Sequence, residues 1–186
     1  MGIFDNLNQP ANSVPQYPVQ GGNRSVNVVF PQLPDTFEQF KALPQAALAT
    51  PFDTAALTVL AFCFYPQDKE TSLAMVDFLK GPQPLSNYDK SFIADRFRGV
   101  DYIPRSYFNG ATPQNDYRPS QPYTVTVSEN PYSYQNQGYA KLFIRSGGAD
   151  SPREVLLRQA KDGKWYLWEQ YLLVGIRTPE SSNPWA

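Results

Sequence analysis

The hydrophobic pattern of this chain changes its period once, between residues 100 and 122. Before this segment, apolar residues recur three positions apart, as at Leu73, Val76 and Leu79, a spacing that is typical of one face of an α-helix. After it, apolar and polar residues alternate, as in residues 123–128, a pattern that is typical of a half-buried β-strand. We therefore expect an α+β fold, with helices in the first half and an antiparallel sheet in the second.

About four helices are predicted in the first half, each with a capping residue at its start and a proline or glycine at its end. The second of them begins at Pro51 and ends before Pro66. It is apolar nearly all round, which is typical of a helix with neighbours on every side, so we expect it at the centre of the domain. The predicted N-terminal caps are Asp35, Thr50, Asp68 and Ser86.

The second half predicts an antiparallel sheet of three to five strands, on which the helices pack. Residues 26–30 are expected to be an extended entry into the first helix. The turn signal Asp162-Gly163 is typical of a hairpin and joins the last two strands. The predicted strands cover residues 123–128, 141–145, 153–160 and 164–176.

Composition divides the chain into an arm, a domain and a tail. Residues 1–25 are rich in Pro, Gln and Asn and cannot bury enough apolar surface to offset the entropy lost on ordering, so we expect a flexible arm. Residues 26–178 are expected to form a single α+β domain, and residues 179–186 a loose tail. The arm carries a small apolar tip within residues 3–7. This tip is either part of a disordered leader or an element that docks on a partner or on the domain itself.

No histidine occurs among the 186 residues. This removes Ser-His-Asp and Cys-His catalysis, imidazole general-base chemistry and the usual zinc ligand sets, and we expect neither a metal nor a cofactor. The net charge of −1 and the absence of a run of Lys or Arg also disfavour nucleic-acid binding, which needs a basic surface. The single cysteine, Cys63, lies in an apolar run, and we interpret it as a small buried hydrophobic residue in a chain from a reducing compartment.

No segment of the sequence is typical of a membrane protein. The first residues lack the basic and apolar regions of a signal peptide. The longest apolar run, around residues 55–65, is too short to span a bilayer. We therefore expect a soluble, cytoplasmic protein that does not associate with membranes.

Several strings in the second half are similar to those of a known family. They are SYFNGATP at residues 106–113, SGGADSPR at residues 146–153 and GKWYL at residues 163–167. In this order they resemble an uncharacterised bacterial family of intracellular proteins that is known only as a domain of unknown function. The resemblance runs from about Phe30 to Pro179 and implies no activity, cofactor or catalytic residue.

A second likeness concerns the fold alone. Helices followed by a curved antiparallel sheet are similar to the cone-shaped, nuclear-transport-factor-like architecture. That architecture hosts both isomerases and pure binding modules, so the likeness assigns no function.

Two loops in the second half are candidate binding surfaces. The segment 102–118 has turn signals and repeated tyrosines, and a structured loop of this length is often functional. Either its Tyr, Asn and Arg side chains recognise a ligand or partner, or its tyrosines pack the loop over the sheet. Residues 146–153 either expose backbone amides as an anion-binding nest beside Arg153, or form a turn in which Asp150 pairs with Arg153. The candidate binding residues are Arg105, Tyr107, Asn109, Tyr117, Asp150 and Arg153.

The sequence favours a non-catalytic binding or protein-interaction module that uses residues 102–118 and 146–153, and whose partner is a protein or small molecule of unknown identity. The alternative is a His-independent enzyme with an Asp and a Tyr as acid and base in the apolar cavity of a cone-like fold. A third hypothesis is self-association through the arm or through an exposed strand face, unless that face is covered by the core. The residues predicted to share this face are Tyr166, Trp168, Gln170 and Leu172.

Overall fold

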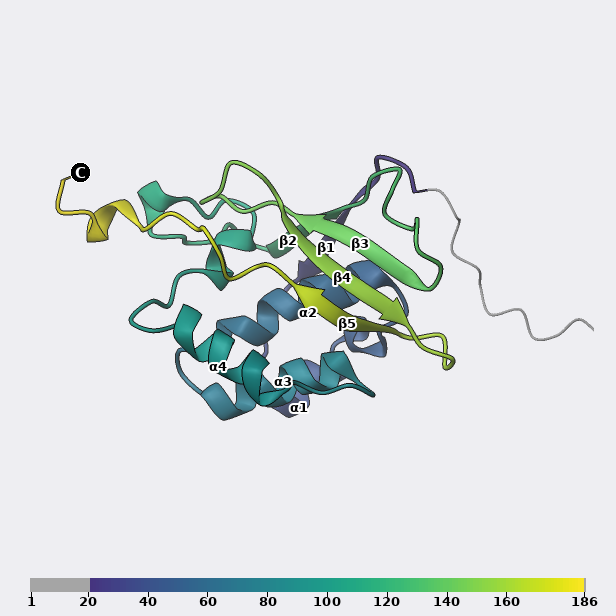
Figure 1. Ribbon diagram of the computed structural model, residues 1–186. Coiled ribbons are helices and arrows are strands. Elements are labelled where there is room, and N and C mark those ends of the chain that lie inside the picture. The colour runs from purple at the N-terminus through teal and green to yellow at the C-terminus, as the bar shows by residue number, and fades with distance from the viewer. Residues whose placement is uncertain (1–20, 186) are drawn as a thin grey trace, which may run out of the picture.

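Residues 21–185 are described by the computed structural model (Figure 1). They form a five-stranded antiparallel sheet with the strand order β1-β2-β3-β4-β5, so the predicted α+β class is confirmed. The strands are β1 Ser25–Phe30, β2 Tyr123–Ser128, β3 Tyr139–Ile144, β4 Arg153–Gln159 and β5 Trp165–Gln170. The helices are α1 Phe37–Ala42, α2 Pro51–Cys63, α3 Lys69–Lys80 and α4 Asn87–Arg96, with short 3₁₀ helices at Pro44–Ala47, Pro104–Tyr107, Pro113–Asn115 and Glu180–Ser182. The cone-like variant of this class stays a prediction.

Strand β1 is the main departure from the predicted chain order. It precedes the helices and pairs with β2 along its whole length, with Val28 opposite Val125 and Phe30 opposite Tyr123. The sequence indicated only an extended entry segment here. Val28 and Phe30 are buried, while Asn27 before them and Val29 between them are exposed, so the segment alternates as a sheet strand with one solvated face does.

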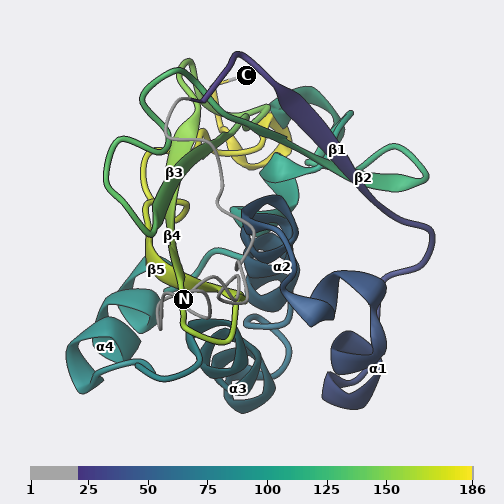
Figure 2. The same cartoon turned by 90° about the vertical axis from the view of Figure 1, so that its right-hand side faces the viewer.

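Helix α2 is the centre of the core, as predicted. It contacts all five strands, and Figure 2 shows it lying against the sheet. Every side chain from residue 54 to residue 62 is buried. The buried hydroxyl groups are satisfied by backbone carbonyls, since Thr54 donates to Trp165 of β5 over 2.6 Å and Thr58 donates to Thr54 over 2.9 Å. Helix α2 therefore positions β5 through a hydrogen bond as well as through packing.

The last residue of α2 is Cys63. It is half-buried, and loss of solvation raises the pKa of its thiol to about 12. A thiol with so high a pKa stays protonated at neutral pH, in line with a packing role.

Apolar as α2 is, no helix within residues 21–185 has the length and apolarity needed to cross a membrane.

Three of the four predicted helix caps are confirmed. Thr50, Asp68 and Ser86 each accept a backbone N–H from the first turn of the helix that follows. Helix α1 is capped by Thr36 instead of Asp35, because the hydroxyl of Thr36 accepts the N–H three residues further on over 3.1 Å. Thr36 has an extended backbone directly before the first helical residue, which is the position from which a capping oxygen reaches this N–H.

A β-bulge in β5 changes which side chains face the solvent. Leu156 of β4 pairs with Glu169, and the next residue, Leu157, pairs with Leu167. Trp168 therefore has no partner of its own and is an extra residue in the ladder. The extra residue reverses the alternation beyond it. The predicted strand face is therefore wrong in part, because Leu172 is buried instead of lying beside Trp168 on the outer face.

The predicted arm, residues 1–25, lies for the most part outside the described residues, and its apolar tip at residues 3–7 lies wholly outside them. Within the described part, Gly22 donates its backbone N–H to the carboxylate of Glu129 over 3.2 Å. The predicted boundaries of arm, domain and tail stay predictions.

Candidate functional site

The two loops that carry the predicted binding residues lie against each other. Gly147 donates its backbone N–H to the carbonyl of Ser106 over 2.9 Å, and the hydroxyl oxygens of Ser106 and Ser146 are 2.8 Å apart in a buried hydrogen bond. The approach is so close that a Cβ on Gly147 would lie 1.9 Å from the carbonyl oxygen of Ala111. Residue 147 therefore has to be a glycine for the loops to meet in this way.

Two of the predicted binding residues, Tyr107 and Tyr117, are buried, with exposed fractions of 1% and 0%. The hydroxyl of Tyr107 donates to the carbonyl of Leu172, and that of Tyr117 donates to the carbonyl of Arg177 over 2.6 Å. Burial raises the pKa of both phenols, which keeps them protonated as donors. Their polar atoms thus hold residues 171–177, which we call the C-terminal segment.

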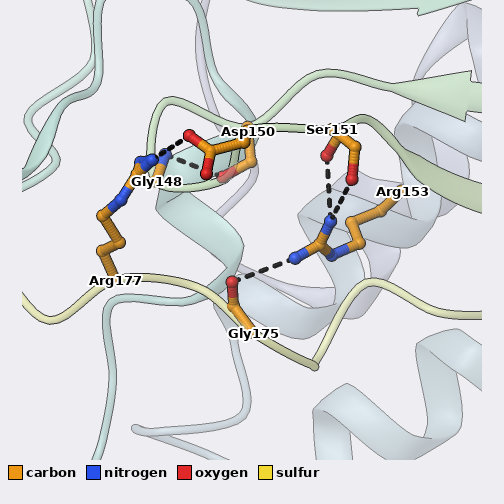
Figure 3. A network of polar contacts seen from close by, with 7 residues as sticks. Gly148, Asp150, Ser151, Arg153, Gly175 and Arg177 are labelled. Carbon is orange, nitrogen blue, oxygen red and sulfur yellow. Dashed lines mark hydrogen bonds and ion pairs between the residues drawn. The ribbon is translucent and has the colours of Figure 1, made fainter.

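The guanidinium of Arg153 binds the same C-terminal segment (Figure 3). It donates to the carbonyls of Val174 and Gly175, each over 2.9 Å, and Figure 3 shows the bond to Gly175. Asp150 forms an ion pair with Arg177, so the predicted pairing of Asp150 with Arg153 is wrong. The N–H groups of Arg153 already donate to backbone carbonyls. The side chain of Arg177 extends beside the exposed carboxylate of Asp150 and pairs with it instead.

The backbone amides of residues 147–149 are occupied by partners within the protein. The first donates to the carbonyl of Ser106 over 2.9 Å, the second to the hydroxyl of Ser146 over 3.1 Å and the third to the carbonyl of Ser146 over 3.4 Å. An anion-binding nest needs amides that point at an open concavity. The alternative, a structural turn, therefore describes this loop.

The remaining two predicted residues, Arg105 and Asn109, lie closer to the solvent and are also bonded. Arg105 is half-buried and contacts Asp101, through a 3.2 Å hydrogen bond to its carbonyl and a 3.8 Å ion pair. Asn109 is exposed and accepts a 3.1 Å hydrogen bond from the hydroxyl of Thr126. The structure therefore gathers the six predicted residues around one junction and uses most of their polar atoms inside the protein.

A groove of about 590 Å³ lies beside this junction. Arg177, Gln114 and Glu180 line it. Gln114 donates to Glu180 over 3.0 Å, and Arg177 pairs with Asp150. Since its main polar groups are already paired, this groove has few atoms left for recognising a ligand.

A second hollow, of about 620 Å³, lies on the outer face of the sheet, away from α2. Its floor is formed by outward side chains of β3, β4 and β5, and its rim by the loop before β3. The aromatic side chains that line it are Tyr132, Tyr139, Phe143 and Trp168. We call this hollow the sheet-face groove.

Trp168 is at the centre of this surface, because it follows the buried Leu167 in β5 and faces outward at the register shift. Its ring packs edge-on against Tyr139, with a centroid distance of 5.8 Å and an interplanar angle of 79°. The guanidinium carbon of Arg158 lies 4.8 Å from the Trp168 ring and 5.3 Å from the Tyr139 ring, which are cation–π contacts. Trp168 also lines two smaller hollows, of about 310 and 380 Å³, next to Lys80. Three hollows therefore meet at this one side chain.

The charged side chains of the sheet-face groove have partners close by. Lys141 and Glu154 form a 3.9 Å ion pair, and Glu169 accepts a 2.9 Å hydrogen bond from Tyr171. That hydrogen bond raises the pKa of Tyr171, so its phenol stays protonated at neutral pH and is a poor general base. Within residues 21–185, no cluster of metal-ligating side chains is placed to hold an ion. These contacts suit binding better than acid–base chemistry.

Sequence reasoning pointed to Trp168 but missed its neighbours Tyr139 and Arg158. A signal was present, because Tyr139 and Phe143 occupy outward positions of β3, where a fully solvated strand face carries polar side chains. The pairing that sets Tyr139 opposite Arg158 depends on the register of two strands, which the alternation alone does not give.

A family model matches residues 32–180, and its description is domain of unknown function (DUF6935). The expected likeness to a family of unknown function is thereby confirmed, while the diagnostic strings and the bacterial origin of that family stay predictions. No curated protein and no solved structure matches the chain.

Proposed function

Because the chain belongs to this family of domains of unknown function, we propose a function from its own surface: a non-catalytic binding module that takes an extended polypeptide segment in the sheet-face groove. The observation that carries the proposal is the position of Trp168. An extra residue in an edge strand places a large aromatic side chain where three hollows meet. Bulges of this kind commonly re-aim a side chain beside a functional site.

The side chains of the groove are the types that dominate protein recognition. Trp, Tyr and Arg are enriched among the residues that contribute most to binding energy. Trp168 and Tyr139 of the groove both pack against Arg158, which lines the neighbouring hollow of about 380 Å³. Neither the indole N–H of Trp168 nor the guanidinium of Arg158 donates a hydrogen bond to another described residue. These donors are therefore available to the backbone carbonyls of a bound segment.

The shape of the groove favours a polypeptide over a small molecule. A site for a small ligand usually buries most of the ligand's surface, whereas this groove lies across the outer side chains of three strands and is open to the solvent. A segment laid across the strands would contact the floor with one side only. Recognition through alternate side chains and backbone carbonyls is typical of extended peptides.

The two loops were the binding surface expected from the sequence. In the present proposal they have a supporting role, because Tyr107, Tyr117 and Arg153 bind carbonyls of the C-terminal segment. A ligand at the loops is the competing outcome of the experiment that follows.

The experiment is a selection of random twelve-residue peptides, displayed on phage, against the full chain. An enriched peptide is then titrated into the ¹⁵N-labelled protein. We expect shifts of the Trp168 indole signal and of the Tyr139 and Lys141 amides. Trp168→Ala and Arg158→Met should each weaken binding at least about tenfold, the size of effect expected at a residue central to an interface.

Trp185→Ala is the matched control, because Trp185 is 93% exposed on the tail and does not line the sheet-face groove. The amide spectra of all variants establish that they are folded. Shifts confined to the loop residues Arg105 and Asn109 would move the site to the loop junction. Failure to enrich any peptide would remove the proposal.

A further inference from the structure

We infer that the polypeptide segment bound in the sheet-face groove carries an Asp or Glu side chain, and that its carboxylate binds in the adjoining hollow of about 380 Å³. This inference rests on the proposed function and names the chemistry of the partner. The hollow lies between the end of α3 and the hairpin that joins β4 to β5, and we call it the basic hollow.

The charge that lines the basic hollow is entirely positive. Of the described residues, Lys80, Arg158 and Lys161 line it, and no Asp or Glu does. The whole chain, by contrast, is nearly balanced, with 16 Lys and Arg against 17 Asp and Glu. Each of the other three hollows described above has a carboxylate in its lining, such as Glu169 or Glu180. A recess with one sign of charge attracts a group of the opposite charge.

Within residues 21–185, none of these three cations forms an ion pair. Two carboxylates lie beside the basic hollow, and both are occupied. Asp162 accepts hydrogen bonds from a backbone N–H and from the hydroxyl of Tyr166. Asp89, which lines the hollow of about 310 Å³ together with Lys80, accepts two hydrogen bonds from Ser86. The positive charge is therefore left for a group that the described residues do not supply.

The walls of the basic hollow hold two of the cations in place. The ammonium of Lys80 donates to the carbonyl of Trp168 over 3.1 Å, and the guanidinium carbon of Arg158 lies 4.8 Å from the Trp168 ring. The wall beside them is closely packed, because a Cβ on Gly81 would lie 2.3 Å from the ring of Tyr166. Cations that are already positioned lose less entropy on binding an anion than mobile side chains do.

Trp168 joins the basic hollow to the sheet-face groove. Its side chain lines both, and Arg158 of the hollow lies 5.3 Å from the ring of Tyr139, which belongs to the groove. A segment that crosses the strands and contacts Trp168 is therefore placed to insert one side chain into the hollow.

The three cations select which side chain this is. Asp and Glu are the side chains that carry a negative charge at neutral pH, and a carboxylate can accept two parallel hydrogen bonds from a guanidinium. Arg158 has five N–H donors, so it can bind a carboxylate and still donate to a backbone carbonyl of the same segment.

The test uses the full chain and twelve-residue peptides that are displayed on phage with their C-termini fused to the coat protein, so that no terminal carboxylate is presented. We expect an Asp or Glu at one fixed position of the enriched sequences. The peptide is then synthesised with blocked ends in two forms, one with the acid and one with the matching amide, Asn or Gln. The amide form should bind at least about tenfold more weakly, because it loses charge-assisted hydrogen bonds. The difference should shrink as the salt concentration rises.

Lys161→Met tests whether the acid binds in the basic hollow. We expect this variant to weaken binding of the acidic peptide at least about threefold and to leave binding of the amide form unchanged, because the substitution removes charge at an exposed site. The matched control is Lys164→Met, which makes the same change of charge in the same hairpin at a residue that does not line the hollow. It should leave the affinity of both peptides unchanged. The amide spectra establish that both variants are folded.

The failures of the two proposals are distinguishable. Peptides that shift the Trp168 indole signal but bind equally well in their acid and amide forms overturn this inference and leave the binding module. Equal losses in Lys161→Met and Lys164→Met overturn it as well, because the charge of the hairpin as a whole would then attract the acid. An affinity that falls in Lys141→Met instead places the carboxylate in the groove and also overturns it. If no peptide is enriched, both proposals fall.

Discussion

The hydroxyl of Tyr117 donates a 2.6 Å hydrogen bond to the backbone carbonyl of Arg177, 60 positions further along the chain. The ring of Tyr117 stacks on that of Tyr102 at 5.5 Å, so the phenol is fixed in direction as well as in position. In return, the backbone N–H of Arg177 donates to the carbonyl of Gly148 over 2.9 Å. The C-terminal segment is thus joined to both loops, and the following predictions test what each contact contributes.

Tyr107→Phe removes a buried hydroxyl and leaves the carbonyl of Leu172 without that partner. An unsatisfied buried acceptor costs about 1–3 kcal/mol, so we expect the free energy of unfolding to fall by this amount. Urea denaturation measures it. Tyr88→Phe is the control, because Tyr88 is 79% exposed, and a change there should stay within about 0.5 kcal/mol. Equal effects of the two substitutions would contradict the structural role of Tyr107.

Arg153→Met keeps the aliphatic stem and removes the donors that bind Val174 and Gly175. We expect local opening of the C-terminal segment, with roughly tenfold faster hydrogen exchange at the Arg177 amide, because hydrogen bonds from a charged donor contribute about 1.5 kcal/mol or more. Mass spectrometry of exchanged peptides measures this. Arg145→Met, at an exposed site, should leave the exchange of the segment unchanged.

Gly147→Ala places a methyl group where the carbonyl oxygen of Ala111 lies, so the loops have to move apart. We expect a loss of about 1–3 kcal/mol in the free energy of unfolding, as for other overpacked contacts. Gly22→Ala is the control, since its Cβ would meet only Glu129, at an ordinary contact distance of 3.9 Å. A Gly147→Ala variant with unchanged stability and unchanged loop amide signals would contradict this prediction, because it would show that the two loops accommodate the added methyl group.

Asp162 provides a pH-dependent contribution to stability. The backbone N–H of Lys164 donates to its carboxylate over 2.9 Å and the hydroxyl of Tyr166 over 2.8 Å, and these hydrogen bonds hold the pKa of Asp162 below its ordinary value of 3.8. Because the folded pKa is the lower one, the stabilisation is present above pH 3.8 and is lost as the pH falls through the folded pKa.

An NMR titration of the Asp162 carboxyl carbon measures this directly. We expect an inflection below 3.8, which moves back toward 3.8 in Tyr166→Phe. An inflection at or above 3.8 in the unchanged chain would contradict the hydrogen-bonding account.

The elements that local sequence determines could be predicted. Thr50 followed by Pro51 specifies a helix start through atoms only a few bonds apart, and the apolar residues that follow require burial whatever their partner is. The cap of α1 shows the limit of this reasoning, because Asp35 and Thr36 are both good capping residues. The choice between them depends on one backbone conformation.

The candidate site could be predicted only in part, because its geometry depends on distant partners. Whether Tyr107 faces a ligand or the protein interior is decided by a carbonyl 65 positions away. The burial of Leu172 results from a one-residue shift between β4 and β5, because a shift of one residue reverses every later side chain. Residue types therefore identified the segments that come together, but they did not distinguish the side chains that bond within the protein from those that face the solvent.

Strands β1 and β2 are neighbours in the sheet, yet the whole helical half of the chain is synthesised between them. At roughly 5–20 residues per second, the first strand leaves the ribosome on the order of ten seconds before its partner. Pairing then closes a long loop, and such high contact order slows folding. We expect β1, the first strand to be synthesised, to be among the last to pair. The rate of folding is then limited by chain topology and not by the formation of the helices.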